Sequence, residues 1–254
     1  MRQALDLAVQ AAREAGEVLL ERYGEHLAYE EKSRRADLVT EVDRRSERLI
    51  VERIKAASPG ATIVAEESGV HAGHTEERWF IDPLDGTTNY AHTYPMFCVS
   101  IACEQRGELV AAVVFAPKLG ELFTAERGSG AFVDGKRISV SPVRHVADAL
   151  VGTGFVSTGL ERNLPHFRAL SDVSHGVRRD GSAAIALSFV AAGRLDAFWE
   201  FGLSPWDVAA GALLVREAGG VLSAPDGSPF DYAAGDVLAT NGALHAEMQR
   251  HLSG

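Results

Sequence analysis

The chain has 254 residues, of which 46% are hydrophobic and 24% are charged, and its formal net charge is −10. This length and composition are ordinary for a globular protein with ample apolar surface to bury, in one large domain or two packed halves. The acidic charge and the lack of a block of basic residues argue against nucleic acid or an anionic membrane as the main partner.

The beginning of the chain is predicted to form two helices. Apolar residues recur at helical spacing over residues 5–19, and Gly24 is a suitable stop. A second helical pattern covers residues 40–57 and ends at a Pro-Gly pair at 59–60. Both patterns are amphipathic, so each helix is expected to cover one face of a larger core.

After residue 60 the chain changes to short apolar runs separated by glycine-containing turns. Several runs are nearly continuous in apolar residues, which is typical of strands covered on both faces. The predicted strands are residues 62–65, 78–82, 97–104, 109–116 and 121–125.

From about residue 141 the predicted strands and helices alternate. The expected strands are residues 149–153, 177–179, 195–199 and 237–240. The expected helices are residues 164–170, 182–192 and 205–218, followed by a short last helix. This pattern predicts an α/β layered architecture in which two halves, about 1–140 and 141–254, share one interface within a single domain.

Cys98 and Cys103 lie five residues apart in one apolar run. An odd separation on a strand points two side chains to opposite faces, so we expect buried, reduced thiols instead of a disulfide. The N-terminus has no apolar signal core, and no apolar run has the length of a membrane span. These observations predict a soluble, cytoplasmic protein.

The most informative segment is the run Trp-Phe-Ile-Asp-Pro-Leu-Asp-Gly-Thr-Thr-Asn-Tyr at residues 79–90. Asp82 and Asp85 lie three residues apart, where an apolar strand gives way to a Gly-Thr turn and a predicted helix start. Carboxylate oxygens are the ligands that Mg²⁺ prefers, and a helix N-terminus beside a glycine offers N–H groups to a phosphate. The segment therefore predicts a metal-dependent phosphate site.

Further polar clusters occur at residues 37–43, 65–69, 179–184 and 204–211, at predicted strand ends and helix starts. Taken singly, Asp43 and Asp207 are compatible with acids that stabilise helix N-termini, and Glu66 is compatible with a solvated loop. Together, acids at these places are what a metal site in an α/β sheet requires. A phosphatase with an Asp-x-Asp nucleophile pair is a poor match, because two residues separate the aspartates here.

These motifs resemble the inositol monophosphatase family. The resemblance rests on the segment 82–90, on Glu66-Glu67-Ser68 upstream and on residues 206–211 downstream. It extends over nearly the whole chain, through Lys32, Asp37 and the segments 128–141 and 217–220. It implies the α-β-α-β-α sandwich shared with fructose-1,6-bisphosphatase, in agreement with the alternating pattern.

The resemblance also implies roles for individual residues. Glu66, Asp82 and the backbone carbonyl of Leu84 match the ligands of a first Mg²⁺, and Asp82, Asp85 and Asp207 match those of a second. A third, weaker ion in the family is held mostly by water and by the glutamate that matches Glu66, so two to three Mg²⁺ are expected.

The remaining matched positions concern water and substrate. Thr87 and Asp43 match the pair that orients the attacking water, so Asp43, Thr87 and Glu66 are the expected catalytic residues. The N–H groups of Gly86 and Thr87 match a phosphate cradle. The positions implied to contact the substrate are Asp85, Gly86, Thr87, Ala183, Glu200 and Asp207.

The expected function is a Mg²⁺-dependent phosphomonoesterase that hydrolyses inositol monophosphate by in-line attack of a metal-activated water, without a phosphoenzyme. Fructose-1,6-bisphosphatase, histidinol-phosphate phosphatase and nucleotide 3′-phosphatase activities are the alternatives, together with a regulatory role on the transcription machinery. Ser204 and Pro205 replace a histidine and a cysteine common in animal members, which weakens any strict inositol preference. The resemblance further implies lithium sensitivity and a homodimer.

Overall fold

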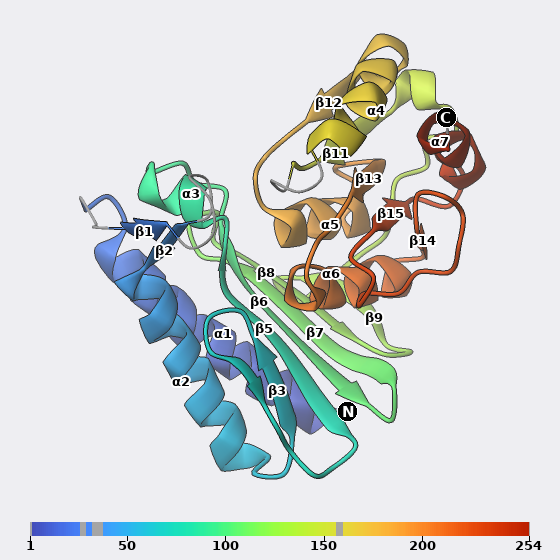
Figure 1. Cartoon of the computed structure of the whole chain (residues 1–254). Coiled ribbons are helices and arrows are strands. Elements are labelled where there is room, and N and C mark those ends of the chain that lie inside the picture. Colours follow the sequence, from blue (N-terminus) through green and yellow to red (C-terminus); the bar gives the residue numbers. More distant parts are fainter. Residues whose placement is uncertain (1, 26–28, 32–37, 156–159, 254) are drawn as a thin grey trace.

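Sheets and helices alternate in layers along the molecule (Figure 1). The computed structural model describes residues 2–25, 29–31, 38–155 and 160–253. Within these residues an eight-stranded sheet is covered by helices on both faces, and a five-stranded sheet follows it. A separate pair, β1 (Tyr29–Glu31) and β2 (Leu38–Thr40), lies beside the start of α2. Lys32 and Asp37, which contribute to the family resemblance, lie outside the described residues.

The larger sheet has the strand order β10-β9-β8-β7-β6-β5-β3-β4. Neighbouring strands are antiparallel, except that β3 and β5 are parallel. The strands are β3 (Thr62–Ala65), β4 (Gly69–His71), β5 (Glu77–Asp85), β6 (Cys98–Gln105), β7 (Glu108–Ala116), β8 (Glu121–Glu126), β9 (Gly130–Val133) and β10 (Lys136–Ile138).

Both faces of this sheet are buried, because side chains alternate along each strand. In β5, Trp79 and Ile81 pack on the side of the first two helices, whereas Phe80 packs on the opposite side. In β6, Cys98 and Cys103 likewise belong to opposite apolar clusters, and both are buried and free. Burial raises the pKa of both thiols, so they remain protonated. The prediction of two unpaired, buried cysteines is confirmed.

The helices form three layers around the sheets (Figure 1). Helices α1 and α2 cover the outer face of the large sheet, α5 and α6 lie between the sheets, and α4 and α7 cover the far face of the small sheet. The helices, with a short α3 beside the site, are α1 (Arg2–Arg22), α2 (Glu41–Ala57), α3 (Thr87–Ala91), α4 (Leu160–Val173), α5 (Ala183–Ala191), α6 (Pro205–Glu217) and α7 (His245–Leu252).

The smaller sheet has the order β12-β11-β13-β15-β14. Its parallel pairs are β11 with β12 and β11 with β13, and the other neighbours are antiparallel. The strands are β11 (Leu150–Thr153), β12 (Gly176–Arg178), β13 (Ala197–Glu200), β14 (Val221–Ser223) and β15 (Val237–Thr240). A one-turn 3₁₀ helix, Val146–Asp148, precedes β11.

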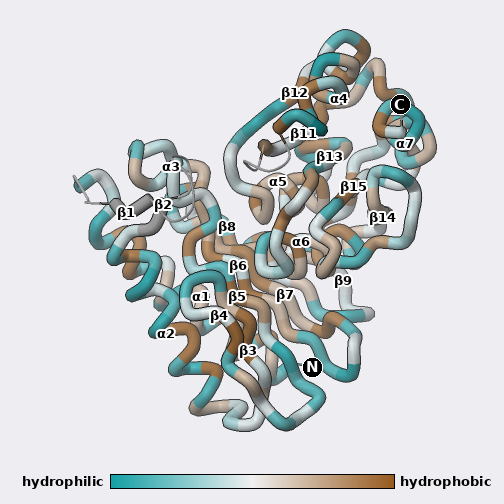
Figure 2. Tube along the Cα trace, viewed as in Figure 1, coloured by the Kyte–Doolittle hydropathy of each residue, from teal (hydrophilic) through white to brown (hydrophobic). Residues whose placement is uncertain are grey.

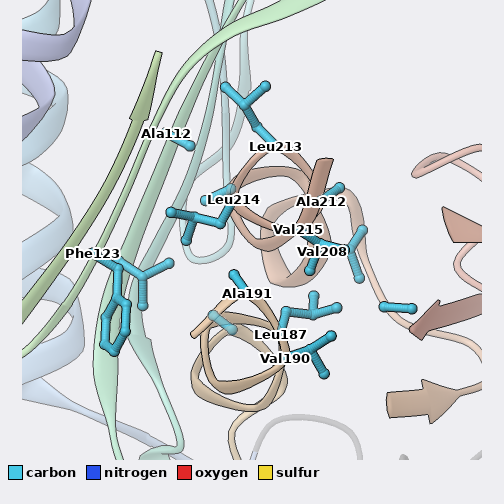
Figure 3. Packing of buried hydrophobic residues seen from close by; sticks show 14 of the residues in the cluster. Ala112, Phe123, Leu187, Val190, Ala191, Val208, Ala212, Leu213, Leu214 and Val215 are labelled. Carbon is cyan, nitrogen blue, oxygen red and sulfur yellow. The ribbon is translucent and has the colours of Figure 1, made fainter. Parts of the chain in front are cut away.

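The central layer joins the two sheets through small and branched side chains (Figure 3). Leu187 and Val190 of α5 lie beside α6, whose Leu214 packs in the same cluster as Phe123 of β8. A Cβ at Gly211 of α6 would lie only 2.5 Å from Leu187 Cβ, so glycine permits the close approach of these helices. Figure 2 shows the matching concentration of apolar residues along β5, β6 and β7, with polar residues in the connecting loops.

The predicted layered α/β fold is confirmed, and the predicted strands of the large sheet recur with end shifts of a few residues. The strands β4, β9, β10 and β14 were not predicted, because they have only three or four residues each and lie among glycine-containing turns or polar residues. None of the helices in the described residues has the length and apolarity needed to cross a membrane.

Candidate active site

The end of β5 leaves the regular ladder and turns towards the space between the two sheets. The pairing with β6 is irregular between Asp82 and Asp85, where Pro83 cannot donate to the ladder. The freed N–H of Leu84 donates to Asp82 Oδ1 at 2.9 Å. Gly86 follows with φ of 99°, and a Cβ there would lie 2.7 Å from the Met96 carbonyl oxygen. Glycine therefore allows the sharp turn into α3.

Acidic residues from other elements gather at this turn. Glu66 follows β3, and Asp207 lies in the first turn of α6. Burial, followed by the nearby charges of Glu66, Asp85 and Asp207, raises the pKa of Asp82 well above its ordinary value. Burial and the charge of Asp85 raise the pKa of Asp207 in the same way. Carboxylates that disfavour each other's charged form must lie close together in a medium of low polarity.

Asp85 is held by the start of α5, which belongs to the second half of the chain. Its Oδ2 accepts hydrogen bonds from the Ser182 hydroxyl and the Ala184 N–H, both at 2.7 Å. Burial raises the pKa of Asp85 to about 6, although these hydrogen bonds act in the opposite direction. Asp207 is fixed within its own capping box, where Oδ2 accepts the Ser204 N–H at 2.7 Å. Each carboxylate is therefore oriented through one of its two oxygens.

Asp43 and Thr87 form a pair next to the acidic cluster. The Thr87 hydroxyl lies 3.0 Å from Asp43 Oδ1 and 3.0 Å from the Leu84 carbonyl oxygen. The other oxygen of Asp43 accepts the Thr40 N–H at 2.9 Å, as part of the capping box that begins α2. Burial raises the pKa of Asp43, against the hydrogen bonds from Thr40 and Thr87. Asp43 therefore combines the helix-capping role considered from sequence with a contact to the site.

A cavity of about 620 Å³ opens over these residues, between the two halves of the chain. It contains every predicted site residue except Asp43, which lies behind Thr87: Glu66, Asp82, Leu84, Asp85, Gly86, Thr87, Ala183, Glu200 and Asp207. Another hollow, of about 700 Å³, lies at the far end of the large sheet beside Gly60 and Glu77. The smaller cavity is the better candidate site, because the buried acids line it.

Glu200 reaches the cavity from the second half of the chain. It ends β13 and is buried, and a Cβ at Gly154 would lie only 2.1 Å from its Oε2. Gly154 thus makes room for this carboxylate. Ala183, at the first position of α5, lines the same cavity.

Asn89 lies within the sequence motif at residues 79–90, but the sequence predicted no role for it. Its Nδ2 donates to the Met96 carbonyl oxygen at 2.6 Å and to the Asp180 carbonyl oxygen at 2.7 Å. Asn89 therefore connects α3 to the loop before α5 at the lining of the cavity. Ser182 was also quoted without a role. An N-cap serine before a small-residue helix is a visible signal, but its bond to Asp85 depends on the fold.

The donor set suits hard divalent cations. Buried carboxylates that raise each other's pKa are relieved by positive charge, and oxygen ligands are those of Mg²⁺. Among the described residues, no group of three or more His, Cys, Asp or Glu side chains is already arranged to coordinate a metal ion. The pKa shifts and the shared cavity, not a preformed ligand cage, carry the fit.

Comparison with known proteins agrees with this site. The sequence matches the inositol monophosphatase family over residues 1–253. The chain belongs to the inositol monophosphatase family. Members of this family are metal-dependent phosphoric monoester hydrolases, so the prediction of a phosphatase of this family is confirmed.

Relatives with two different names match this chain over most of its length. The inositol-1-monophosphatase of Synechocystis is 46% identical over 98% of this chain and 88% of its own length. The Nus factor SuhB of Pseudomonas aeruginosa is 46% identical over 99% of this chain and 98% of its own. The crystal structure of the extragenic suppressor protein suhB from Bartonella henselae has a TM-score of 0.93 and 41% identity, covering 97% of each chain.

Proposed function

We propose that the protein is a Mg²⁺-dependent phosphomonoesterase that hydrolyses inositol monophosphate or a closely similar polyol phosphate. The observation that carries this proposal is the meeting of Asp82, Asp85 and Asp207 in one cavity, beside the Asp43–Thr87 pair. The names of relatives such as the Synechocystis protein support inositol monophosphate as the first substrate to test.

In this proposal carboxylates from both halves of the chain would hold two to three Mg²⁺ ions. Glu66, Asp82 and the Leu84 carbonyl would hold the first ion. Asp82, Asp85 and Asp207 would hold the second, and Glu66 with water would hold a third. When bound, the ions would neutralise phosphate charge and make water more acidic. Because both halves supply ligands, we also propose that 1–140 and 141–254 act as one catalytic domain.

Asp43 and Thr87 are proposed to orient the attacking water. The Thr87 hydroxyl has one proton and two acceptors, Asp43 Oδ1 and the Leu84 carbonyl oxygen, both at 3.0 Å. When the proton points to either one, the lone pairs of the Thr87 oxygen are available to accept a hydrogen bond from water. The carboxylate of Asp43 would hold the Thr87 hydroxyl in place. The oriented water would then attack phosphorus directly, without a phosphoenzyme.

The remaining proposed contacts concern the substrate. The N–H groups of Gly86 and Thr87 would bind the phosphate, since Gly86 adopts the left-handed conformation and Thr87 begins α3 beside the acids. Glu200, Ala183 and Asp85 would contact the hydroxyls of the alcohol. A buried carboxylate at Glu200 discriminates against analogues that lack the matching hydroxyl, because its own hydrogen bonds would be lost. Asp207 would contribute both to metal binding and to this subsite.

A second role is favoured by one comparison. The relative from Pseudomonas aeruginosa, named Nus factor SuhB, is 46% identical over nearly its whole length. A regulatory contact with the transcription machinery is therefore the alternative function. Pull-down that is unaffected by Asp85→Asn would show that such binding is independent of catalysis. We further propose a lithium-sensitive, cytoplasmic homodimer, on the strength of the family resemblance and the two free cysteines.

The deciding experiment measures phosphate release from inositol 1-phosphate, fructose 1,6-bisphosphate, histidinol phosphate and a 3′-phosphonucleotide, each with and without Mg²⁺. Asp85→Asn serves as the blank. Mg²⁺-dependent release led by inositol 1-phosphate supports the proposal, and inhibition by millimolar lithium would support it further. A nucleotide preferred above all other esters would overturn the substrate. Absence of release from every ester would favour the binding role.

A further inference from the structure

Helix α2 carries a buried polar face directed towards the metal-binding turns. Asp43, Ser46 and Glu47 follow one another at spacings of three and one, so they share one side of the helix. All of them are buried, while Ile50 and Ile54 of the same helix pack in the apolar cluster under the large sheet. Burying hydroxyl and carboxyl groups is costly unless they are hydrogen-bonded, so their partners identify their purpose.

Glu47 binds the turn that follows Glu66. Its Oε2 accepts the Glu67 N–H at 2.7 Å, and its Oε1 accepts the Ser68 N–H at 2.8 Å. On the other side, the N–H of Glu66 itself donates to the Ile81 carbonyl oxygen at 3.2 Å. Hydrogen bonds therefore fix the backbone on both sides of the Glu66 Cα, at the N–H of Glu66 and at the N–H of Glu67.

Ser46, the residue before Glu47, contacts the second ligand-bearing turn, the one at Asp82–Leu84. Its hydroxyl donates to the Pro83 carbonyl oxygen at 3.0 Å. Pro83 lies between Asp82 and Leu84, in the stretch where pairing with β6 is irregular. A backbone that has left the ladder needs another hydrogen-bond donor, and Ser46 supplies it.

We propose that Glu47 and Ser46 are positioning residues that hold Glu66 and the Asp82–Leu84 turn in the geometry required for divalent cations. This inference rests on the proposed function, because it concerns the same metal site. Charge-assisted hydrogen bonds to two successive N–H groups restrict the turn more than neutral ones would. Partners that orient ligands in this way change metal affinity about 10–100-fold when they are lost.

The test compares three variants of the full chain. In Glu47→Gln one acceptor oxygen becomes an NH₂ group facing a backbone N–H, and Ser46→Ala removes the donor to Pro83. The matched control is Asp196→Asn, another buried carboxylate that accepts a backbone N–H, from Leu150 at 2.6 Å. Asp196 does not line the candidate cavity.

Two readouts separate positioning from general stability. Mn²⁺ binding to each protein is measured by the electron paramagnetic resonance of free Mn²⁺, without substrate. Half-saturation by Mg²⁺ and kcat at saturating Mg²⁺ are measured by phosphate release, and Tm is measured on the same samples. We expect Glu47→Gln to weaken Mn²⁺ binding and raise the Mg²⁺ half-saturation about tenfold or more, with a smaller change in kcat. Asp196→Asn should lower Tm but leave metal affinity within twofold.

Metal affinity of Glu47→Gln and Ser46→Ala within twofold of wild type would overturn the positioning role and leave the proposed function intact. An equal loss of affinity in Asp196→Asn would also overturn it, because destabilisation alone would then explain the effect. If Glu47→Gln does not fold, Ser46→Ala decides, with a several-fold weaker affinity expected at nearly unchanged Tm. Wild-type protein that binds no Mn²⁺ would instead contradict the proposed function itself.

Discussion

Asp196 and the acids of the candidate site differ in what surrounds them. Asp196, in the second half, accepts hydrogen bonds from the Ser141 hydroxyl and the Leu150 N–H. Its own carbonyl oxygen accepts the Asn241 N–H at 3.1 Å. In the candidate site, by contrast, Asp82 and Asp207 lie close to other acids, and burial and neighbouring charges raise the pKa of each.

The difference shows how one residue type serves two purposes. The carboxylate of Asp196 accepts one donor at each oxygen, so it is a structural connection from the start of β13 to β11 and to the loop before β11. The acids of the site gain a few local donors but also repel one another, so bound cations are needed to stabilise their charged forms. Burial alone does not identify a functional acid, whereas burial among like charges does.

Removal of one acid from each group should give the largest contrast. Asp82→Asn is expected to lower Mg²⁺-dependent phosphate release by at least about 100-fold, more than the loss of an outer partner would. Asp196→Asn should leave kcat nearly unchanged while lowering Tm. The assay is steady-state phosphate release with inositol 1-phosphate, accompanied by circular dichroism to verify folding. Similar kinetic losses in both variants would remove the distinction between the two groups.

Substitutions of Thr87 test whether catalysis requires the Asp43–Thr87 pair in addition to the metal-binding acids. Thr87→Ala should lower kcat by about 100-fold, because the hydroxyl that orients water is lost. Thr87→Ser keeps that hydroxyl and is expected to retain most of the activity. The two variants are compared at saturating Mg²⁺, so that changes in metal affinity do not contribute. Equal activity in Thr87→Ala and wild type would show that the hydroxyl does not orient water, and would leave Asp43 with its helix-capping role alone.

Repulsion within the site should appear as pH-dependent stability of the metal-free protein. The folded-state pKa of Asp85 is raised from 3.8 to about 6, so stability is lost as pH rises from about 4 through 6. The cost is on the order of 3 kcal/mol above that window. In EDTA, Asp85→Asn should therefore melt above wild type at pH 8, by roughly 6 °C or more, and the gap should narrow towards pH 4. A gap that does not change with pH would contradict the interpretation.

The smallest effect is expected from the connection that Asn89 makes at the lining of the cavity. Asn89→Ala removes donors to the Met96 and Asp180 carbonyl oxygens and should cost about 1–2 kcal/mol of unfolding free energy. Asn241→Ala is the matched control, because Asn241 Nδ2 also donates twice, to Ser141 and Val143. Both variants should lose stability, but only Asn89→Ala should raise KM. An equal change in KM in the two variants would show that the hydrogen bonds of Asn89 do not influence substrate binding specifically.

Much of the fold could be predicted because its main strands are long apolar runs with turns between them. The strands β9 and β10 were missed because they are short hairpin strands at the sheet edge, stabilised mainly by pairing with neighbours. The acids of the site were visible because they stand at strand ends and helix starts. No role could be assigned to Glu47 or Asn89 from sequence, because their most distant hydrogen-bond partners lie 21 and 91 residues away and only the fold brings them together.

The most direct test of the account is the anomalous scattering of Mn²⁺ in crystals of the wild-type protein. The account predicts peaks within coordination distance of Glu66, Asp82, Asp85 and Asp207, and loss of the peak shared by Asp82 in crystals of Asp82→Asn. Ordered Mn²⁺ elsewhere in the molecule, with none among these carboxylates, would contradict the claim that the buried acids form the metal site.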